Sequence, residues 1–423
     1  MGRPLSVIER AVATFDRAAP LNFTAYARVR GPLDEAAARV ALSSIQARHP
    51  PLRLHLEGDR FVDGAPPIPL RLADDLVAAA NHEIATPFVE GEALLRAVLI
   101  PGDGVLLTFH HVIGDGRSGA LLARDFVQSA AAVLRGDDAT LPALTAQLPI
   151  DARIPSLGFR GVLRVLYLVL LEVWQRVRYG APLKVPRVRD LPAWERPAKV
   201  IVRWFSPSVV DALTLVARAE GVTIHTIVSA ALLLAIAGTH ARATHRAAFG
   251  TPLDVRKELT PPGEDEIGFL VSMLGYRGLV TRGEPLFDLA RRIKRELDTE
   301  KRWQGSVIGL VLVSVAARLL SRGRSDRAVA VKFGDLLQTT SGLTNLGRLA
   351  IEASHPPLTI EAFAFTANPS VLGDFIASAA TLNGHMSLWF AHASPMIDRA
   401  VAEAIADETC ARVHAAVHSG PCG

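Results

Sequence analysis

The chain has 423 residues, of which 49% are hydrophobic and 21% are charged, and its formal net charge is +4. This length and composition suit two domains of ordinary size, each with a sizeable core. The small net charge and the lack of a long basic run argue against nucleic-acid binding. Cys410 and Cys422 lie near the end of the chain, so neither a disulfide framework nor a metal site is expected and a reducing compartment is the default.

The first 150 residues read as strands with helices packed against a sheet. No apolar secretory segment precedes Glu9 and Arg10, so we expect a cytoplasmic protein. Ser6 and Glu9 have the spacing of a capping box, which predicts a helix to about residue 17. The other expected helices are residues 33–48 and 118–134, and the expected strands are residues 21–29, 52–57, 61–62, 68–72, 94–100 and 105–110.

Frequent prolines mark a change of composition between about residues 137 and 197. Within this stretch, residues 157–179 are apolar with charged residues interspersed, and their longest uncharged run, residues 165–171, is too short to span a membrane. Two interpretations stay open. The segment is either an amphipathic helix that covers the fold or crosses between domains, or an interfacial helix near a lipid.

The second half of the chain again mixes strands and helices. We expect His225, which follows the helix-capping pattern at Thr223, to be a neighbour of the cap rather than a catalyst. The expected strands are residues 200–205, 247–255 and 381–390, and the expected helices are residues 207–218, 227–237, 285–301, 303–320 and 398–417.

The strand at residues 105–110 ends in a chemically unusual turn. His110 and His111 come first, then Asp115 between two glycines, then a helix that begins near Ser118. Adjacent residues on a strand point to opposite faces, so the two histidines cannot share one role. A neutral imidazole in a cleft can take a proton from an alcohol or an amine. Asp115 is placed either to orient the surroundings of that ring or to tie the turn down.

Two other interpretations of this turn have to be considered. A histidine in an apolar run is commonly a core residue without a chemical role. Gly114, Gly116 and Gly119 also match the glycine spacing of a dinucleotide-binding loop. That fold would need a buried strand ending in an acidic residue after the helix, and residues 135–142 do not provide one.

The order His-His-x-x-x-Asp-Gly resembles the signature of acyltransferases related to chloramphenicol acetyltransferase. This superfamily includes the condensation domains of peptide synthetases and the stand-alone polyketide-associated O-acyltransferases, which are the nearest by motif order and length. The resemblance implies that His111 is the general base, that His110 has a structural role, and that Asp115 is held by an arginine from elsewhere. Gly116 would let the backbone approach closely.

Two later segments extend the resemblance. Residues 254–259, followed by residues 267–272, resemble a superfamily segment that nominates Arg256 as the partner of Asp115. A guanidinium suits that task because it can bind a carboxylate in bidentate fashion, although a solvated surface arginine is the plain alternative. Residues 340–348 resemble a Ser/Thr-Asn-x-Gly stretch. The candidates there for contact with the substrate or the thioester oxygen are Ser341, Asn345 and Gly347.

The resemblance implies an α/β fold of two chloramphenicol acetyltransferase-like sandwich domains, arranged as a pseudo-dimer around a central tunnel. We expect residues 1–150 to form the first domain, residues 151–197 a linker with the amphipathic helix, and residues 198–423 the second domain. Residues 157–179 and 303–320, both rich in Leu and Val, could wall that tunnel or lean on a lipid surface.

The implied reaction transfers an acyl group from a CoA or carrier-protein thioester to a hydroxyl, in natural product or lipid biosynthesis, without a bound cofactor or metal. The modest positive charge would suit a phosphorylated acyl carrier protein as partner, and peripheral lipid contact is a further expectation. Two alternatives stay open: an amide-forming condensation enzyme, and a non-catalytic module that binds a carrier protein.

Overall fold

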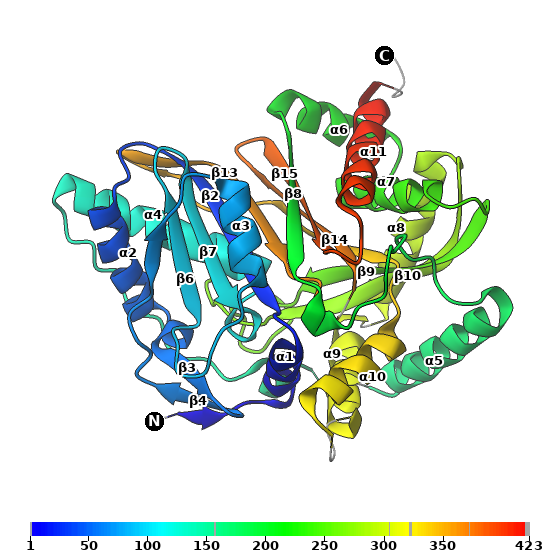
Figure 1. Ribbon diagram of the computed structural model, residues 1–423, viewed down its shortest axis with the longest axis horizontal. Helices are drawn as coiled ribbons and strands as arrows, with labels where there is room; N and C mark the ends of the chain where they lie inside the picture. Colours follow the sequence, from blue (N-terminus) through cyan, green and yellow to red (C-terminus); the bar gives the residue numbers. More distant parts are fainter. Residues whose placement is uncertain (1, 156–157, 304, 321–323, 372, 419–423) are drawn as a thin grey trace.

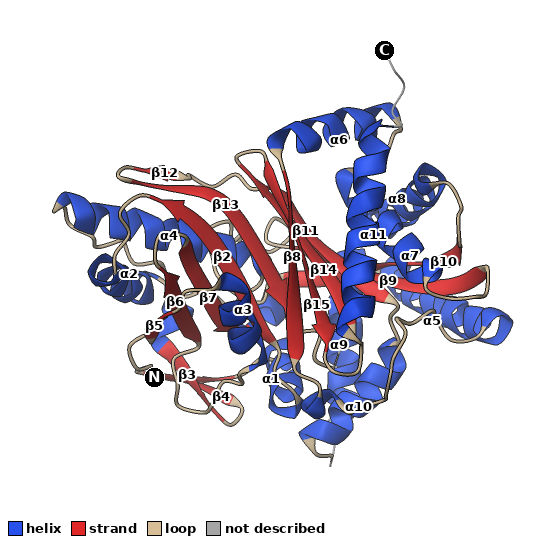
Figure 2. Cartoon of the chain, turned by 45° about the horizontal axis from the view of Figure 1, so that its top comes forward, coloured by secondary structure: helices blue, strands red, loops and turns tan. Residues whose placement is uncertain are grey.

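The computed structural model describes residues 2–155, 158–303, 305–320, 324–371 and 373–418. It contains two six-stranded mixed sheets in neighbouring lobes, so the predicted α/β class is confirmed (Figures 1 and 2). From edge to edge, the first sheet contains β12 (Ser354–His355), β13 (Leu358–Ala367), β2 (Asn22–Arg30), β7 (Gly104–His110), β6 (Leu95–Ile100) and β5 (Leu70–Leu72). The second contains β10 (Val271–Thr281), β9 (Thr244–Asp254), β11 (Ser341–Arg348), β14 (Phe375–Leu382), β15 (His385–Ala393) and β8 (Ala198–Phe205). A small third sheet contains β1 (Arg3–Pro4), β4 (Arg60–Asp63) and β3 (Leu54–Glu57).

Helices cover a face of each large sheet. α2 (Glu35–Arg48) and α4 (Gly116–Arg135) pack over the first sheet, and α7 (Ile224–Gly238) is buried over the second. Between the lobes, α3 (Leu76–Ala85) contacts both β2 and β8 and closes a smaller apolar cluster. The remaining helices are α1 (Val7–Ala18), α5 (Phe159–Tyr179), α6 (Pro207–Ala219), α8 (Leu286–Arg302), α9 (Gly305–Leu320), α10 (Asp326–Leu337) and α11 (Arg399–His418).

The second half of the chain supplies two strands to the first sheet. β13 pairs antiparallel with β2, with Phe363 opposite Ala27 and Phe365 opposite Ala25. Both phenylalanines are fully buried. The expected boundary after residue 197 therefore does not separate the two sheets. The physical reason is that β2 would have an unpaired edge without β13.

Several local predictions can be compared directly with the structure. The capping box at Ser6 is present, as predicted, and His225 lies in the first turn of α7 next to the cap at Thr223. That His225 is not a catalyst stays a prediction. The single strand expected at residues 381–390 is wrong: β14 and β15 form a hairpin there, turning at Asn383 and Gly384, which have positive φ angles of 50° and 80°. Residues 157 and 304, at or near the starts of two predicted helices, and Cys422 lie outside the described residues.

No single helix among the described residues has both the length and the hydropathy of a membrane span. In the described parts of the chain, only α6 and α7 together meet that criterion, and the chain bends by 95° between them.

Candidate active site

The histidine motif lies where β7 leads into α4. His110 is the last residue of β7, whereas His111 opens a short 3-10 turn that ends at Ile113. The two histidines were expected to point to opposite faces of one strand. In the structure they belong to different elements, because the strand ends between them. His110 is buried, its Nδ1 accepts the Val112 N–H at 3.1 Å, and its Nε2 lies 3.2 Å from Asp16 Oδ2. These contacts hold the turn together, as a structural role for His110 requires.

A single backbone contact holds the neutral ring of His111 in one tautomer. Its Nδ1 lies 2.6 Å from the carbonyl oxygen of Gly114. Since a carbonyl can only accept, Nδ1 carries the proton and Nε2 of the neutral ring keeps its lone pair. Burial lowers the pKa of His111 below its ordinary 6.5, which keeps the ring neutral near pH 7. The rings of Phe23 and Phe269 flank the imidazole at 5.2 and 5.0 Å.

Asp115 caps α4 and joins it to the second lobe. Its Oδ1 accepts the Ser118 N–H at 2.9 Å, and its Oδ2 accepts the Leu270 N–H at 3.1 Å. Arg256 donates to both oxygens, at 2.9 and 3.0 Å, so the predicted bidentate pair is present. Burial alone would raise the pKa of Asp115, but the charge and hydrogen bonds of Arg256 outweigh it and hold the pKa below its usual value.

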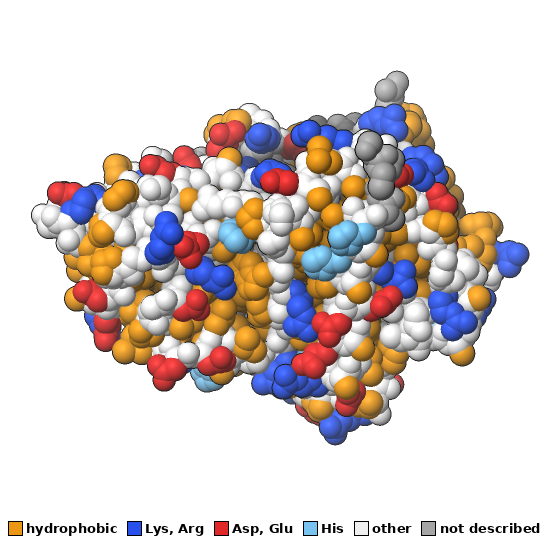
Figure 3. Space-filling view, turned by 90° about the horizontal axis from the view of Figure 1, so that it is seen from above, with side chains coloured by type: hydrophobic (Ala, Val, Ile, Leu, Met, Phe, Trp, Pro, Cys, Tyr) orange, Lys and Arg blue, Asp and Glu red, His pale blue; other side chains and the backbone are white. Residues whose placement is uncertain are grey.

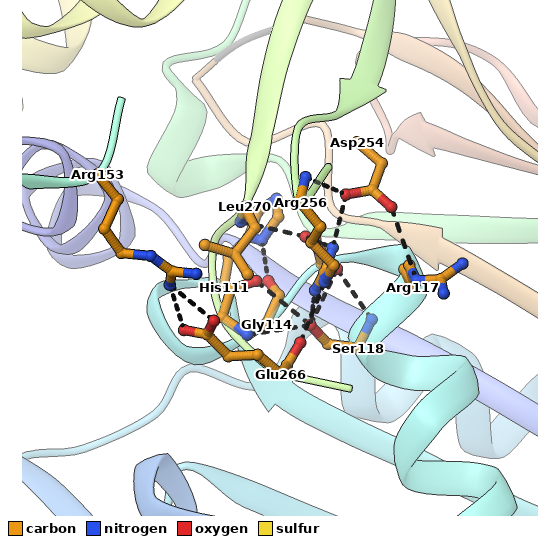
Figure 4. A network of polar contacts seen from close by, with 11 residues as sticks. His111, Gly114, Arg117, Ser118, Arg153, Asp254, Arg256, Glu266 and Leu270 are labelled. Carbon is orange, nitrogen blue, oxygen red and sulfur yellow. Dashed lines mark hydrogen bonds and ion pairs between the residues drawn. The ribbon is translucent and has the colours of Figure 1, made fainter. Parts of the chain in front are cut away.

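Arg256 is fully buried, so its interpretation as a solvated surface arginine is wrong. Besides Asp115, its guanidinium donates to Ser118 Oγ at 2.9 Å, to Asp254 at 3.0 Å and to the Glu266 carbonyl at 3.1 Å. Figure 4 shows these side chains converging between α4 and the segment that links β9 to β10, next to His111. The network fixes the start of α4, and with it the histidine turn, against the second lobe.

The glycines of the motif serve close packing. A Cβ atom on Gly116 would lie 2.9 Å from the ring of Phe365 and 3.2 Å from Leu346, and one on Gly119 would lie 2.7 Å from Ala25. The close approach expected of Gly116 is thus confirmed.

The glycine spacing does not belong to a dinucleotide-binding unit. Such a unit has parallel strands, whereas both neighbours of β7 in the sheet are antiparallel to it.

The predicted segment of residues 340–348 contains all of β11 and lies against the start of α4 through Leu346. Ser341 is buried and donates its hydroxyl to the Phe375 carbonyl at 2.8 Å, which connects β11 to β14. Contact of Ser341 with a substrate stays a prediction. Asn345 is partly exposed, and its side-chain oxygen accepts the N–H of Gly347, which has a φ of 67°. Contact of Asn345 and Gly347 with a thioester oxygen stays a prediction.

Sequence reasoning did not identify Asp16 and Ser118 as parts of this site. Asp16 lies in α1, far from the motif in sequence, and no local pattern marks it. Ser118 was predicted only as a helix start, although its hydroxyl contacts Asp115, Arg256 and Gly268. The sequence signal that could have identified Ser118 was its position three residues after an Asp at a helix cap.

No group of three or more His, Cys, Asp or Glu side chains in the described part of the chain is placed to hold one metal ion, and a metal-free site stays a prediction.

Residues 196–332 match the family model described as phthiocerol/phthiodiolone dimycocerosyl transferase C-terminus. Relatives include the nonribosomal peptide synthetase kk1B of Curvularia clavata, 31% identical over 63% of this chain. Another is the beauvericin nonribosomal cyclodepsipeptide synthetase of Beauveria bassiana, 29% identical over 77% of this chain. The chain spans 2% and 10% of the lengths of these two proteins.

Solved structures share the fold over nearly the whole chain. Polyketide synthase associated protein 5 from Mycobacterium tuberculosis has a TM-score of 0.67 and 20% identity, covering 97% of this chain and 98% of its own. For the TRI3 trichothecene 15-O-acetyltransferase from Fusarium sporotrichioides the TM-score is 0.72 and the identity 12%, with coverage of 98% and 95%. The first condensation domain of the calcium-dependent antibiotic synthetase has a TM-score of 0.68 and 15% identity, with coverage of 99% and 97%. The chain therefore has the two-lobed fold of the chloramphenicol acetyltransferase-like condensation superfamily, as the histidine motif predicted.

Proposed function

We propose that this protein is an acyltransferase that moves an acyl group from a thioester to a hydroxyl, with His111 as the general base. The donor is the thioester of CoA or of a phosphopantetheinyl carrier protein. The observation that carries the proposal is the 2.6 Å hydrogen bond from His111 Nδ1 to Gly114 O, because in the neutral ring it places the proton on Nδ1 and leaves Nε2 able to accept one. The fold shared with an enzyme named as a 15-O-acetyltransferase supports ester formation.

In the proposed reaction, Nε2 of His111 removes the proton of the acceptor hydroxyl as its oxygen attacks the thioester carbonyl. A C–O bond forms, and the C–S bond breaks when the tetrahedral intermediate collapses. The leaving thiolate takes the proton back from the imidazolium, so the ring ends neutral. No acyl-enzyme is needed, because the acceptor attacks the donor directly.

Amide formation is the second candidate, since the sequence relatives named above include peptide synthetases. An amine acceptor would use the same base and the same thioester. Asp115 and Arg256 position the turn in either case and do not discriminate between the acceptors.

The test measures free-thiol release from decanoyl-CoA, and from the decanoyl thioester of a carrier protein, with octanol or octylamine as acceptor. These acceptors match in length and differ only in the attacking atom. We expect octanol to stimulate thiol release and octyl decanoate to accumulate. Release with octylamine alone would favour the condensation enzyme. Donor binding without release for either acceptor would identify a non-catalytic carrier-binding module.

A further inference from the structure

The apolar side of α5 faces away from the protein. It lies along the outside of the second lobe, at the edge of the molecule in both ribbon views (Figures 1 and 2). Ten large apolar side chains of α5 are between 49% and 85% exposed. They are Phe159, Val162, Leu163, Leu166, Tyr167, Val169, Leu170, Val173, Trp174 and Val177. Successive helix residues turn by about 100°, so these positions cover an outward arc of about 160° over the whole helix.

The inward side of α5 carries the polar contacts of the helix, next to the buried Leu168. Glu172 binds Arg246, which is buried, through two contacts of 2.6 Å. Gln175 donates to the Arg277 carbonyl at 3.0 Å, and Arg164 lies 3.4 Å from Glu300, which is also buried. Rolling the helix to hide its apolar arc would leave Arg246 and Glu300 without these partners, and an uncompensated buried charge is costly. The contacts with the second lobe therefore hold the apolar side outward.

This orientation corrects one expectation about the segment. An outward apolar side cannot wall an internal tunnel, so the ten exposed side chains of α5 do not do so. In α9, by contrast, Val307, Ile308 and Leu310 are buried in the protein. Monomeric proteins rarely expose a continuous apolar surface of this size unless it binds something.

The charges at the borders of the arc identify the occupant. By helix geometry Arg178 lies at one border and Arg176 at the other, and both are exposed. The only acidic residue of α5, Glu172, is turned toward the protein. On the face shown in Figure 3, by comparison, acidic and basic side chains are interspersed. We propose that the apolar arc of α5 binds an anionic lipid surface, lying in the interface with its arginines at the headgroups.

The arc also has the aromatic residues of an interfacial helix. Trp174 and Tyr167 combine a large apolar body with one polar atom, which suits the boundary between acyl chains and headgroups. A second copy of the chain fits less well. In a symmetric dimer the same patch meets itself, so the basic borders of two helices would meet with no acidic residue on the arc to pair with them.

The test compares the full chain on two kinds of vesicle: phosphatidylcholine alone, and phosphatidylcholine with about 30% phosphatidylglycerol. We expect flotation with the anionic vesicles and a blue shift of tryptophan fluorescence that is lost in Trp174→Phe. Leu170→Glu should weaken the binding at least about tenfold, because a leucine that would insert among the acyl chains is replaced by a charge. Leu215→Glu, at an equally exposed leucine of α6, is the matched control and should bind like the wild type.

The arginines are tested separately. Arg176→Gln and Arg178→Gln should each weaken binding to anionic vesicles by roughly fivefold and leave the weak binding to neutral vesicles unchanged. Absence of wild-type binding to anionic vesicles overturns the proposal. So does binding that Leu170→Glu and Leu215→Glu weaken equally. A dimer that Leu170→Glu dissociates, without vesicle binding, would assign the arc to a second copy of the chain. None of these readouts depends on the proposed acyl transfer.

Discussion

At the residue scale, the properties of His111 come from one short contact and from burial. A positioned base typically contributes on the order of 10²–10⁴ in rate, so His111→Ala should lower kcat by that factor while the far-UV circular dichroism stays that of the wild type. Because the base must be neutral and its pKa lies below 6.5, kcat/KM should rise with pH and level off before neutrality. Thiol release across pH 4.5–8 measures both.

Two histidine variants serve as controls. His385→Ala, at an exposed position on β15, should change neither rate nor stability. His110→Ala should instead lower the midpoint of thermal unfolding, because Asp16 loses the imidazole it contacts at 3.2 Å. Near wild-type turnover in His111→Ala, or a half-maximum of kcat/KM well above pH 6.5, would contradict the assigned base.

At the element scale, Asp115 and Arg256 connect the start of α4 to the segment after β9. Removing one charge leaves the other buried without compensation, so Asp115→Asn and Arg256→Gln should each lower the free energy of unfolding by about 3–5 kcal/mol. Asparagine caps a helix about as well as aspartate, so the first variant isolates the charge. The double variant should lose less than the sum of the single losses, as urea unfolding measures.

The matched control is an exposed pair on α11. Arg399 and Glu403 lie 2.8 Å apart, and the side chain of Arg399 is 85% exposed. Arg399→Gln and Glu403→Gln should each change the free energy of unfolding by less than about 1 kcal/mol and should be nearly additive. Strict additivity at Asp115 and Arg256 would show that their contact does not stabilise the folded protein.

At the scale of the whole molecule, β13 and the Asp115–Arg256 pair make the first lobe depend on the second half of the chain. A fragment of residues 1–197 lacks both, and it exposes the edge of β2 together with the apolar surface that Phe363 and Phe365 cover. We expect this fragment to be unfolded or aggregated, without a cooperative thermal transition. Circular dichroism and light scattering, with the full chain as reference, measure this. A monomeric fragment that melts cooperatively would mean that the first lobe is an independent domain.

Local patterns along the chain were enough to predict the parts of this protein that they specify. Hydrophobic periodicity and capping residues predicted most helices and several strands, because those signals lie within one element. The order of histidines, aspartate and glycines predicted the turn between β7 and α4, and the resemblance to the superfamily nominated Arg256. Most of these predictions depend on residues that are neighbours in the sequence. The Asp115–Arg256 contact was predicted because the superfamily pattern includes both residues.

Features that depend on residues far apart in the chain became visible when the chain was folded. Asp16 reaches His110 from another helix, and β13 joins the first sheet from the far end of the sequence. The sequence showed that α5 has an apolar side, but not where that side faces. Arg246 and Glu300 decide it, because they bind the polar side of the helix and leave the apolar side to the surroundings.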